Sequence, residues 1–161
     1  TEVMKVLVAA GANPNIPTAD GTTPLMVASG LAIWNPGEDG GSLMGQEDEV
    51  PAAVKMCVEL GNDVNAVDAN GDTALHGAAL RGANEVIQLL VDKGAKINAV
   101  NKIGWTPWII ADGVFYPNTY NRELESAALL LKLGADKTAG KRREVDLPPT
   151  EALAQSGQAP R

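Results

Sequence analysis

The chain has 161 residues, a length that suits one domain. Hydrophobic residues make up 45% of it and aromatic residues only 4%, so a core must be built mainly from aliphatic and alanine side chains, which suits packed helix pairs better than a sheet sandwich. Thirteen basic and twenty acidic residues give a formal charge of −7, which argues against a nucleic-acid partner because phosphate binding normally needs a basic face.

Residues 1–17 have the pattern of the end of a repeat. Glu2 to Gly11 has the apolar spacing of a helix, closes with Gly-Ala, and aligns with a stretch that starts at Glu85. We interpret it as a partial repeat whose first half lies upstream, so the natural N-terminus is expected to be missing. The compartment is therefore unknown; the cytoplasm is slightly favoured, and export stays open.

Residues 18–67 are predicted to form a long repeat. A first helix is expected over 24–29 and a second from about Glu49, separated by an insertion over about 30–48 that Pro36 and several glycines mark as a loop. The acidic side chains of this loop could bind calcium, but their spacing lacks the pattern of a calcium-binding loop, so no metal site is predicted.

Residues 68–100 form a regular unit of 33 residues. Asp68 to Gly71 is predicted to be a turn, and Thr73 to cap a helix that runs from Ala74 to about Leu80. The small residues 77–79 should let neighbouring helices approach closely. A second helix is expected from Asn84, which with Glu85 would cap it, to the left-handed Gly94.

Residues 101–138 form another long repeat, with an insertion over about 112–122 and a second helix over 123–132. Residues 139–161 are predicted to be a tail, a strap or a disordered terminus, in which Val145 and Leu147 could cover the end of the stack. The basic run Lys141-Arg142-Arg143 is interpreted as a solvated face rather than a nucleic-acid or membrane patch.

A recurring motif supports this division. It occurs as Thr73-Ala-Leu75-His76-Gly-Ala78, as Thr23-Pro-Leu25-Met26-Val-Ala28 and as Thr106-Pro-Trp108-Ile109-Ile-Ala111. Over residues 1–138 the chain resembles ankyrin repeats. The resemblance implies an all-α solenoid of stacked helix-turn-helix units with β-hairpin loops, in which His76 would hold neighbouring hairpins through hydrogen bonds with Thr73 and nearby backbone.

The resemblance also implies that a partner protein binds to the hairpin tips and the first helix of each pair. Carried onto the matching positions, it names Asp20, Asn70, Asp72, Leu80, Arg81, Lys102, Ile103 and Trp105. We expect Trp105, at a hairpin tip, to be an exposed anchor; the alternative is that it packs against the adjacent hairpin.

Four of the aromatic residues lie in the two insertions, namely Trp34, Phe115, Tyr116 and Tyr120. The insertions project from the same end of two repeats and could meet across the turn Arg81-Gly82-Ala83. These side chains would then form either a satellite core that pins two long loops or a site for a ligand or ion.

Nothing in the sequence predicts catalysis. His76 is the one histidine, Cys57 is the one cysteine and lies in an apolar helix, and neither a phosphate-binding loop nor a nucleophile motif is present. No run approaches the roughly 20 apolar residues of a membrane span. We therefore predict a monomeric, non-enzymatic scaffold without cofactor that binds another protein. The alternatives are a ligand site at the insertions and a structural module beside an upstream domain.

Overall fold

The computed structural model describes residues 1–31, 49–115, 120–143 and 146, and its helices occur where the sequence predicts them. In chain order the elements are α1 Glu2–Ala9, α2 Pro24–Ala28, α3 Glu49–Glu59, α4 Ala74–Leu80, α5 Asn84–Asp92, α6 Pro107–Asp112, β1 Val114–Phe115, β2 Tyr120–Asn121 and α7 Leu124–Lys132. The fold is an all-α solenoid, as predicted.

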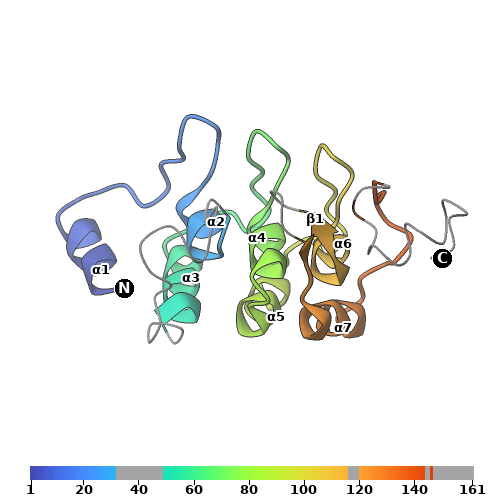
Figure 1. Ribbon diagram of the computed structural model, residues 1–161. Helices are drawn as coiled ribbons and strands as arrows, with labels where there is room; N and C mark the ends of the chain where they lie inside the picture. The colour runs from blue at the N-terminus through green and yellow to red at the C-terminus, as the bar shows by residue number, and fades with distance from the viewer. Residues whose placement is uncertain (32–48, 116–119, 144–145, 147–161) are drawn as a thin grey trace, which may run out of the picture.

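Three helix pairs, α2 with α3, α4 with α5 and α6 with α7, stand side by side in a row (Figure 1). The first helices α2, α4 and α6 contact one another along one layer, and the second helices α3, α5 and α7 form the other layer. The loops before α2, α4 and α6 project from the stack on the same side (Figure 1). This repeated contact of equivalent helices is the arrangement that buries the apolar face of each unit.

The core is aliphatic and alanine-rich, as the composition predicts. Its fully buried large side chains include Leu25, Val54, Leu75, Ile87, Leu90 and Leu130. Cys57 is also buried in this core, and burial raises the pKa of its thiol. The cysteine therefore acts as a small apolar residue, in agreement with its position in the sequence.

Threonines begin the first helices, as predicted. The Thr23 hydroxyl accepts a hydrogen bond from the Met26 N–H at 3.3 Å, and the Thr106 hydroxyl accepts one from the Ile109 N–H at 3.2 Å. Each of these threonines precedes a proline at the first helical position, where a missing N–H costs nothing. The caps fix where each first helix starts and so where each hairpin ends.

Backbone hydrogen bonds connect the successive hairpins. The N–H of Ala69 donates to the carbonyl of Asp20 at 2.7 Å, and the N–H of Lys102 donates to the carbonyl of Asn70 at 2.8 Å. The same bond recurs once more, from the N–H of Lys141 to the carbonyl of Gly104 at 2.7 Å. The start of the C-terminal tail thus continues the row of hairpins.

The predicted close approach of the first helices is confirmed at Gly77. A Cβ atom on this residue would lie 2.7 Å from the backbone nitrogen of Leu31. Glycine is therefore required here for α4 to pack against the chain that leaves α2. The same steric argument explains the small residues that follow it in α4, two alanines that are fully buried.

Two parts of the chain differ from the regular unit. After α6, the strands β1 and β2 pair in antiparallel orientation, with Phe115 opposite Tyr120. Helix α1 has no buried residue, unlike α5, the helix with which it aligns.

Within the described residues no helix is both long and apolar enough to cross a membrane. Trp34, Tyr116, Val145, Leu147 and the acidic loop residues before Glu49 lie outside the described residues.

Candidate protein-binding surface

The hairpin tips and first helices enclose a small pocket between the second and third repeats. Its volume is about 40 Å³, and it is lined by Leu31, Asp72, His76, Leu80, Asn101, Ile103, Trp105 and Ile110. Four of these, Asp72, Leu80, Ile103 and Trp105, are among the positions predicted to bind a partner. The structure therefore brings half of the predicted set together around one pocket, which we call the concave pocket.

The other predicted positions lie around the concave pocket rather than in it. Asp20, Asn70 and Lys102 are exposed at the three successive hairpin tips. Arg81 is different, because its side chain lies against Gly30 and lines a separate cavity.

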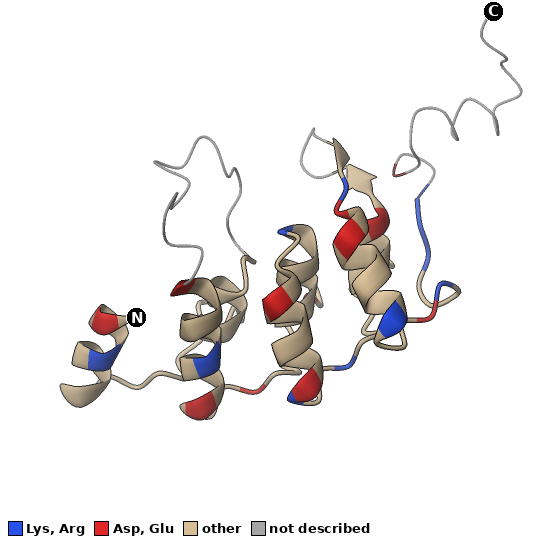
Figure 2. Ribbon diagram, turned by 90° about the horizontal axis from the view of Figure 1, so that it is seen from below, with Lys and Arg blue, Asp and Glu red and all other residues tan. Residues whose placement is uncertain are grey.

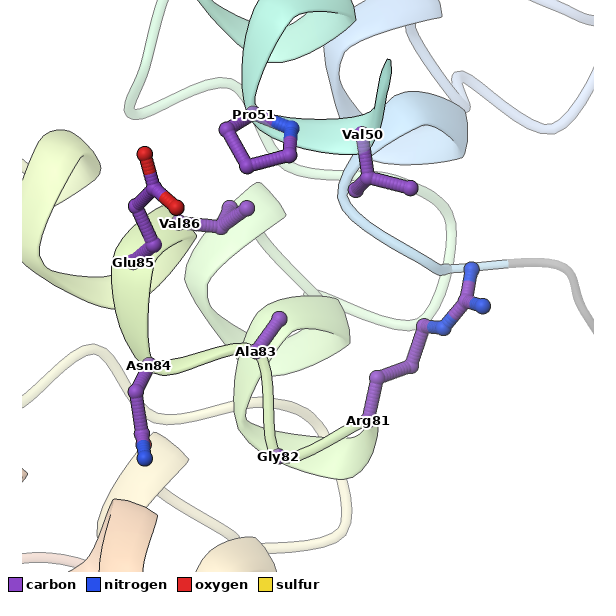
Figure 3. Close-up of a pocket in the computed structure, with 8 residues that line it drawn as sticks. All are labelled: Val50, Pro51, Arg81, Gly82, Ala83, Asn84, Glu85 and Val86. Carbon is purple, nitrogen blue, oxygen red and sulfur yellow. The ribbon is translucent and has the colours of Figure 1, made fainter. Parts of the chain in front are cut away.

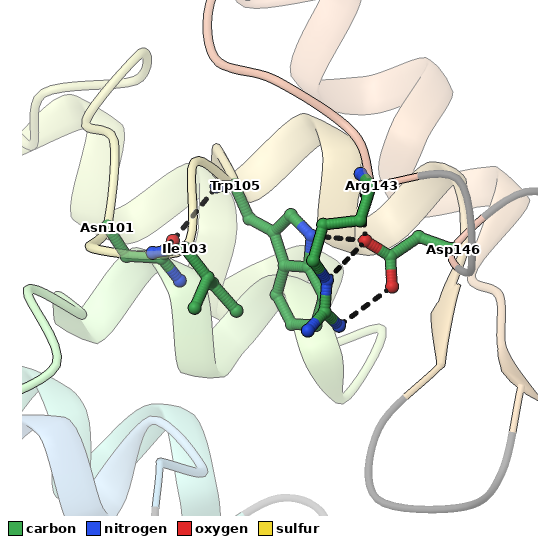
Figure 4. Close-up of polar contacts among 5 residues, drawn as sticks. All are labelled: Asn101, Ile103, Trp105, Arg143 and Asp146. Carbon is green, nitrogen blue, oxygen red and sulfur yellow. Dashed lines mark hydrogen bonds and ion pairs between the residues drawn. The ribbon is translucent and has the colours of Figure 1, made fainter.

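The prediction that Trp105 is an exposed anchor is wrong. Its side chain is 3% exposed, its indole N–H donates to a carboxylate oxygen of Asp146 at 2.8 Å, and the guanidinium of Arg143 lies 4.7 Å from the ring centre (Figure 4). The physical reason is that the start of the tail folds back over the third hairpin. The alternative prediction, that Trp105 packs against the adjacent hairpin, is right about its burial, but the segment that covers it is the tail.

Asp146 organises this contact from a fully buried position. Besides the Trp105 indole, Arg143 donates to it from its backbone N–H at 3.0 Å, from Nε at 2.9 Å and from Nη2 at 2.8 Å. Burial alone would raise the pKa of Asp146, but the hydrogen bonds from Arg143 and Trp105 outweigh it and hold that pKa below its ordinary value. The carboxylate therefore stays ionised.

The basic run in the tail is solvated at Lys141 and Arg143, which are exposed, but both of its arginines also form ion pairs. Arg142 donates to the carboxylate of Asp112 at 2.6 Å, and its side chain is only 16% exposed. Arg143 is paired with Asp146. The pair of Arg142 could not be predicted from a local pattern, because its acidic partner lies 30 residues away at the end of α6.

His76 has the structural role that the resemblance implies. The N–H of Thr73 donates to Nδ1 of His76 at 3.1 Å, so Nδ1 is the unprotonated nitrogen and Nε2 donates to the carbonyl of Trp105 at 3.2 Å. Burial lowers the pKa of His76, which keeps the ring neutral. Nδ1 thus holds the end of its own hairpin, and Nε2 connects this hairpin to the third.

Asp72 and Asn101 form the polar side of the concave pocket. The Asn101 amide N–H donates to Oδ1 of Asp72 at 2.7 Å, and its oxygen accepts from the N–H groups of Ile103 and Trp105 at 3.2 Å and 2.9 Å. Burial raises the pKa of Asp72, while the bond from Asn101 opposes that shift. Asn101 thereby fixes the third hairpin and orients the carboxylate.

A second, larger cavity of about 370 Å³ lies beside the turn between α4 and α5. It is lined by Val50 and Pro51 at the start of α3 and by residues 81–86 (Figure 3). This is the turn across which the two insertions were predicted to meet. In the described part of the second insertion, the rings of Phe115 and Tyr120 lie 5.3 Å apart and are tilted by 58°.

No group of three or more His, Cys, Asp or Glu side chains placed to hold a metal ion occurs in the described part of the chain.

The comparison with known families decides the identity of the fold. A sequence model described as ankyrin repeats, in three copies, matches residues 46–141. The chain belongs to the ankyrin-repeat family. The match covers every residue that lines the concave pocket except Leu31, and it reaches the start of the tail.

Curated relatives share short stretches with this ankyrin-repeat chain. It is 38% identical over 65 residues to serine/threonine-protein kinase 12 of Arabidopsis thaliana, covering 40% of this chain and 14% of that protein. It is 38% identical over 76 residues to protein phosphatase 1 regulatory subunit 27 of Mus musculus, covering 47% of this chain and 45% of that protein. It is 41% identical over 54 residues to ankyrin repeat protein OPG189 of monkeypox virus, covering 34% of this chain and 9% of that protein. The chain therefore spans less than half the length of each.

Proposed function

We propose that this chain is a non-catalytic scaffold that binds another protein through the concave pocket and the hairpin tips around it. The observation that carries the proposal is the set of apolar side chains that remain accessible there. Ile103 is 45% exposed at the third tip, and Val27 is 44% exposed at the position of α2 that corresponds to Ile110 in α6. Half-buried Leu31 and Leu80 line the concave pocket together with Ile103. Accessible apolar side chains of this kind, which we call the accessible strip, are typical of a protein-binding surface.

The rigidity of the hairpin row supports the same proposal. The tips are held to one another by the backbone bonds at Ala69 and Lys102, and the tips bearing Asp72 and Ile103 are also joined through His76 and Asn101. A surface that is already ordered loses little conformational entropy when a partner binds. The buried, fully engaged His76 is consistent with a scaffold rather than a catalyst.

The relatives support binding in general and leave the partner open. The relatives include a kinase, a regulatory subunit of protein phosphatase 1 and a viral ankyrin repeat protein. The shared stretches lie within repeats and cover minor parts of those proteins. A phosphatase or a kinase is thus one class of partner to expect for this chain, and a crosslinking experiment can identify the partner directly.

The test is site-specific photo-crosslinking. A photo-reactive residue at Ile103 should crosslink a protein from the native extract, while one at Lys55, whose side chain is 66% exposed on α3, should not. Mass spectrometry then identifies the partner, and the purified partner should bind the wild-type chain and lose at least about tenfold in affinity for Ile103→Glu. Equal crosslinking at both positions, or unchanged affinity, would argue against the proposal.

A second candidate function rests on the cavity of about 370 Å³. Its lining includes the turn 81–83, across which the sequence predicts that the insertions meet, so the cavity is the candidate site for a small molecule. A thermal-shift screen with a metabolite and calcium panel tests this: a ligand that raises the unfolding temperature of the wild type should fail to do so for the Trp34→Ala, Tyr116→Ala double variant. The absence of any stabilising compound would remove this candidate.

A further inference from the structure

One polar group in the concave pocket is open to a ligand. Both nitrogens of His76 are engaged, and Asn101 uses its amide N–H on Asp72 and its oxygen on the third hairpin. Among the described residues, Asp72 forms no ion pair, and its Oδ2 atom receives no hydrogen bond. Asp72 therefore lines the concave pocket with one carboxylate oxygen that no described donor occupies.

The surroundings of Asp72 are acidic on one side. The two hairpin tips on the N-terminal side of the pocket, residues 18–23 and 68–73, carry Asp20, Asp68 and Asp72 and no lysine or arginine. The chain's own basic run, residues 141–143, follows the third hairpin at the C-terminal end of the stack (Figure 2), where Lys141 bonds to Gly104 and Arg143 lies against the ring of Trp105. Its two arginines are paired with other carboxylates. Burial raises the pKa of Asp72, and the charge of Asp68 raises it less strongly. Both effects make the ionised carboxylate less stable, and a cation bound there would stabilise it.

The shape of the concave pocket limits which cation fits. Its volume is only about 40 Å³, which favours a compact ammonium group over a larger cation. The aliphatic side chains of Leu31, Leu80 and Ile103 also line the pocket and can cover a methylene stem.

We infer that the partner inserts a lysine side chain into the concave pocket, with its ammonium group on Asp72 and its stem against Leu80 and Ile103. The residue next to that lysine is apolar and packs on the accessible strip that includes Val27. The acidic tips lie toward the N-terminal side, so further basic residues of the partner point in that direction. This inference rests on the proposed scaffold function and specifies the chemistry of the segment that binds.

The test uses a phage-displayed library of random twelve-residue peptides selected on the purified chain. The selected peptides should carry a lysine beside an apolar residue. Their affinity should fall at least about tenfold for Asp72→Asn, which keeps an oxygen to accept from Asn101, and should not change for Glu59→Gln, the same charge change on exposed α3. Replacing the peptide lysine by norleucine should cause the same loss in the wild type and none in Asp72→Asn.

Thermal unfolding of each variant verifies that it folds. Peptides without a lysine preference, peptides that bind Asp72→Asn as they bind the wild type, or no selected peptide at all would overturn the inference. If Ile103→Glu abolishes binding while Asp72→Asn does not, the lysine assignment fails and the scaffold function stands. If neither variant changes binding, both fail.

Discussion

The indole N–H of Trp105 donates to the carboxylate of Asp146 at 2.8 Å, and this bond joins the third hairpin to a segment 41 residues further along the chain. It does not stand alone, since the N–H of Lys141 also donates to the carbonyl of Gly104, repeating the bond between earlier hairpins. A stacked repeat array must protect its last unit, which otherwise exposes an unpaired hairpin edge and part of the core. We interpret residues 139–143, together with Asp146, as the segment that provides this protection.

The first prediction concerns that contact. Asp146→Ala removes the acceptor of the Trp105 indole and of three N–H groups of Arg143, and Trp105→Phe removes the indole donor. Each should lower the free energy of unfolding by about 1–3 kcal/mol, because buried donors or acceptors lose their partners. Urea titration of both single variants and the double variant should give a coupling energy of at least about 0.5 kcal/mol. Additive losses would contradict a direct bond, and Lys132→Ala on the exposed face of α7 is the control.

The sequence predicts the helices well because their signals are local. The first helix of the regular unit was predicted from Ala74 to about Leu80 and occurs as α4 over those residues. Its start follows from the capping threonine, and its end is close to Gly82, which has a positive φ of 67°. The role of His76 was also predicted, because it depends on the neighbouring Thr73 and on the next hairpin of the repeat.

Contacts between distant residues could not be predicted in the same way. Asn84 was expected to cap α5, but the cap position is Ala83, and the Asn84 side chain accepts from Ser126 of α7 at 2.6 Å. The burial of Trp105 depends on a tail segment that has no repeat pattern. In both places a long-range partner competes with a local rule, and only the folded chain decides between them.

A second prediction follows from the pKa of His76. Burial lowers that pKa in the folded chain below the ordinary value of 6.5, so between the two values the unfolded chain binds more protons than the folded one. The free energy of unfolding should therefore fall as the pH drops below about 6.5. His76→Met, which copies Met26 of the preceding repeat, should lose this dependence and be less stable at pH 7.5 by about 1–3 kcal/mol, since the carbonyl of Trp105 loses its donor.

The measurement is chemical unfolding of both proteins between pH 5 and pH 7.5. Asp72, whose pKa is raised by burial, shifts stability in the opposite direction as the pH falls, and it is present in both proteins. The difference between the two curves therefore reports the histidine together with its effect on the neighbouring Asp72. Parallel curves would show that the folded and unfolded chains protonate His76 equally.

A third prediction concerns Gly77. Alanine normally stabilises the interior of a helix by up to about 1 kcal/mol relative to glycine. Here the added Cβ would lie 2.7 Å from the Leu31 nitrogen, and overpacking of this kind costs about 1–3 kcal/mol. Gly77→Ala should therefore be destabilised in urea unfolding. Val27→Ala is the matched control, because Val27 occupies the same position in α2, is 44% exposed, and should change stability by less than about 1 kcal/mol.

A fourth prediction compares two leucines at equivalent positions of α1 and α5. Leu7 is 53% exposed, whereas Leu90 is 0% exposed and lies within the core that α5 shares with the other helices. Leu90→Ala should lower the free energy of unfolding by about 2–5 kcal/mol, since it leaves a cavity among packed side chains. Leu7→Ala should cost less than about 1 kcal/mol, because much of the side chain is already in contact with water. Urea unfolding of the two variants checks this, and similar losses would mean that α1 is covered in solution by a contact equivalent to the one that buries Leu90.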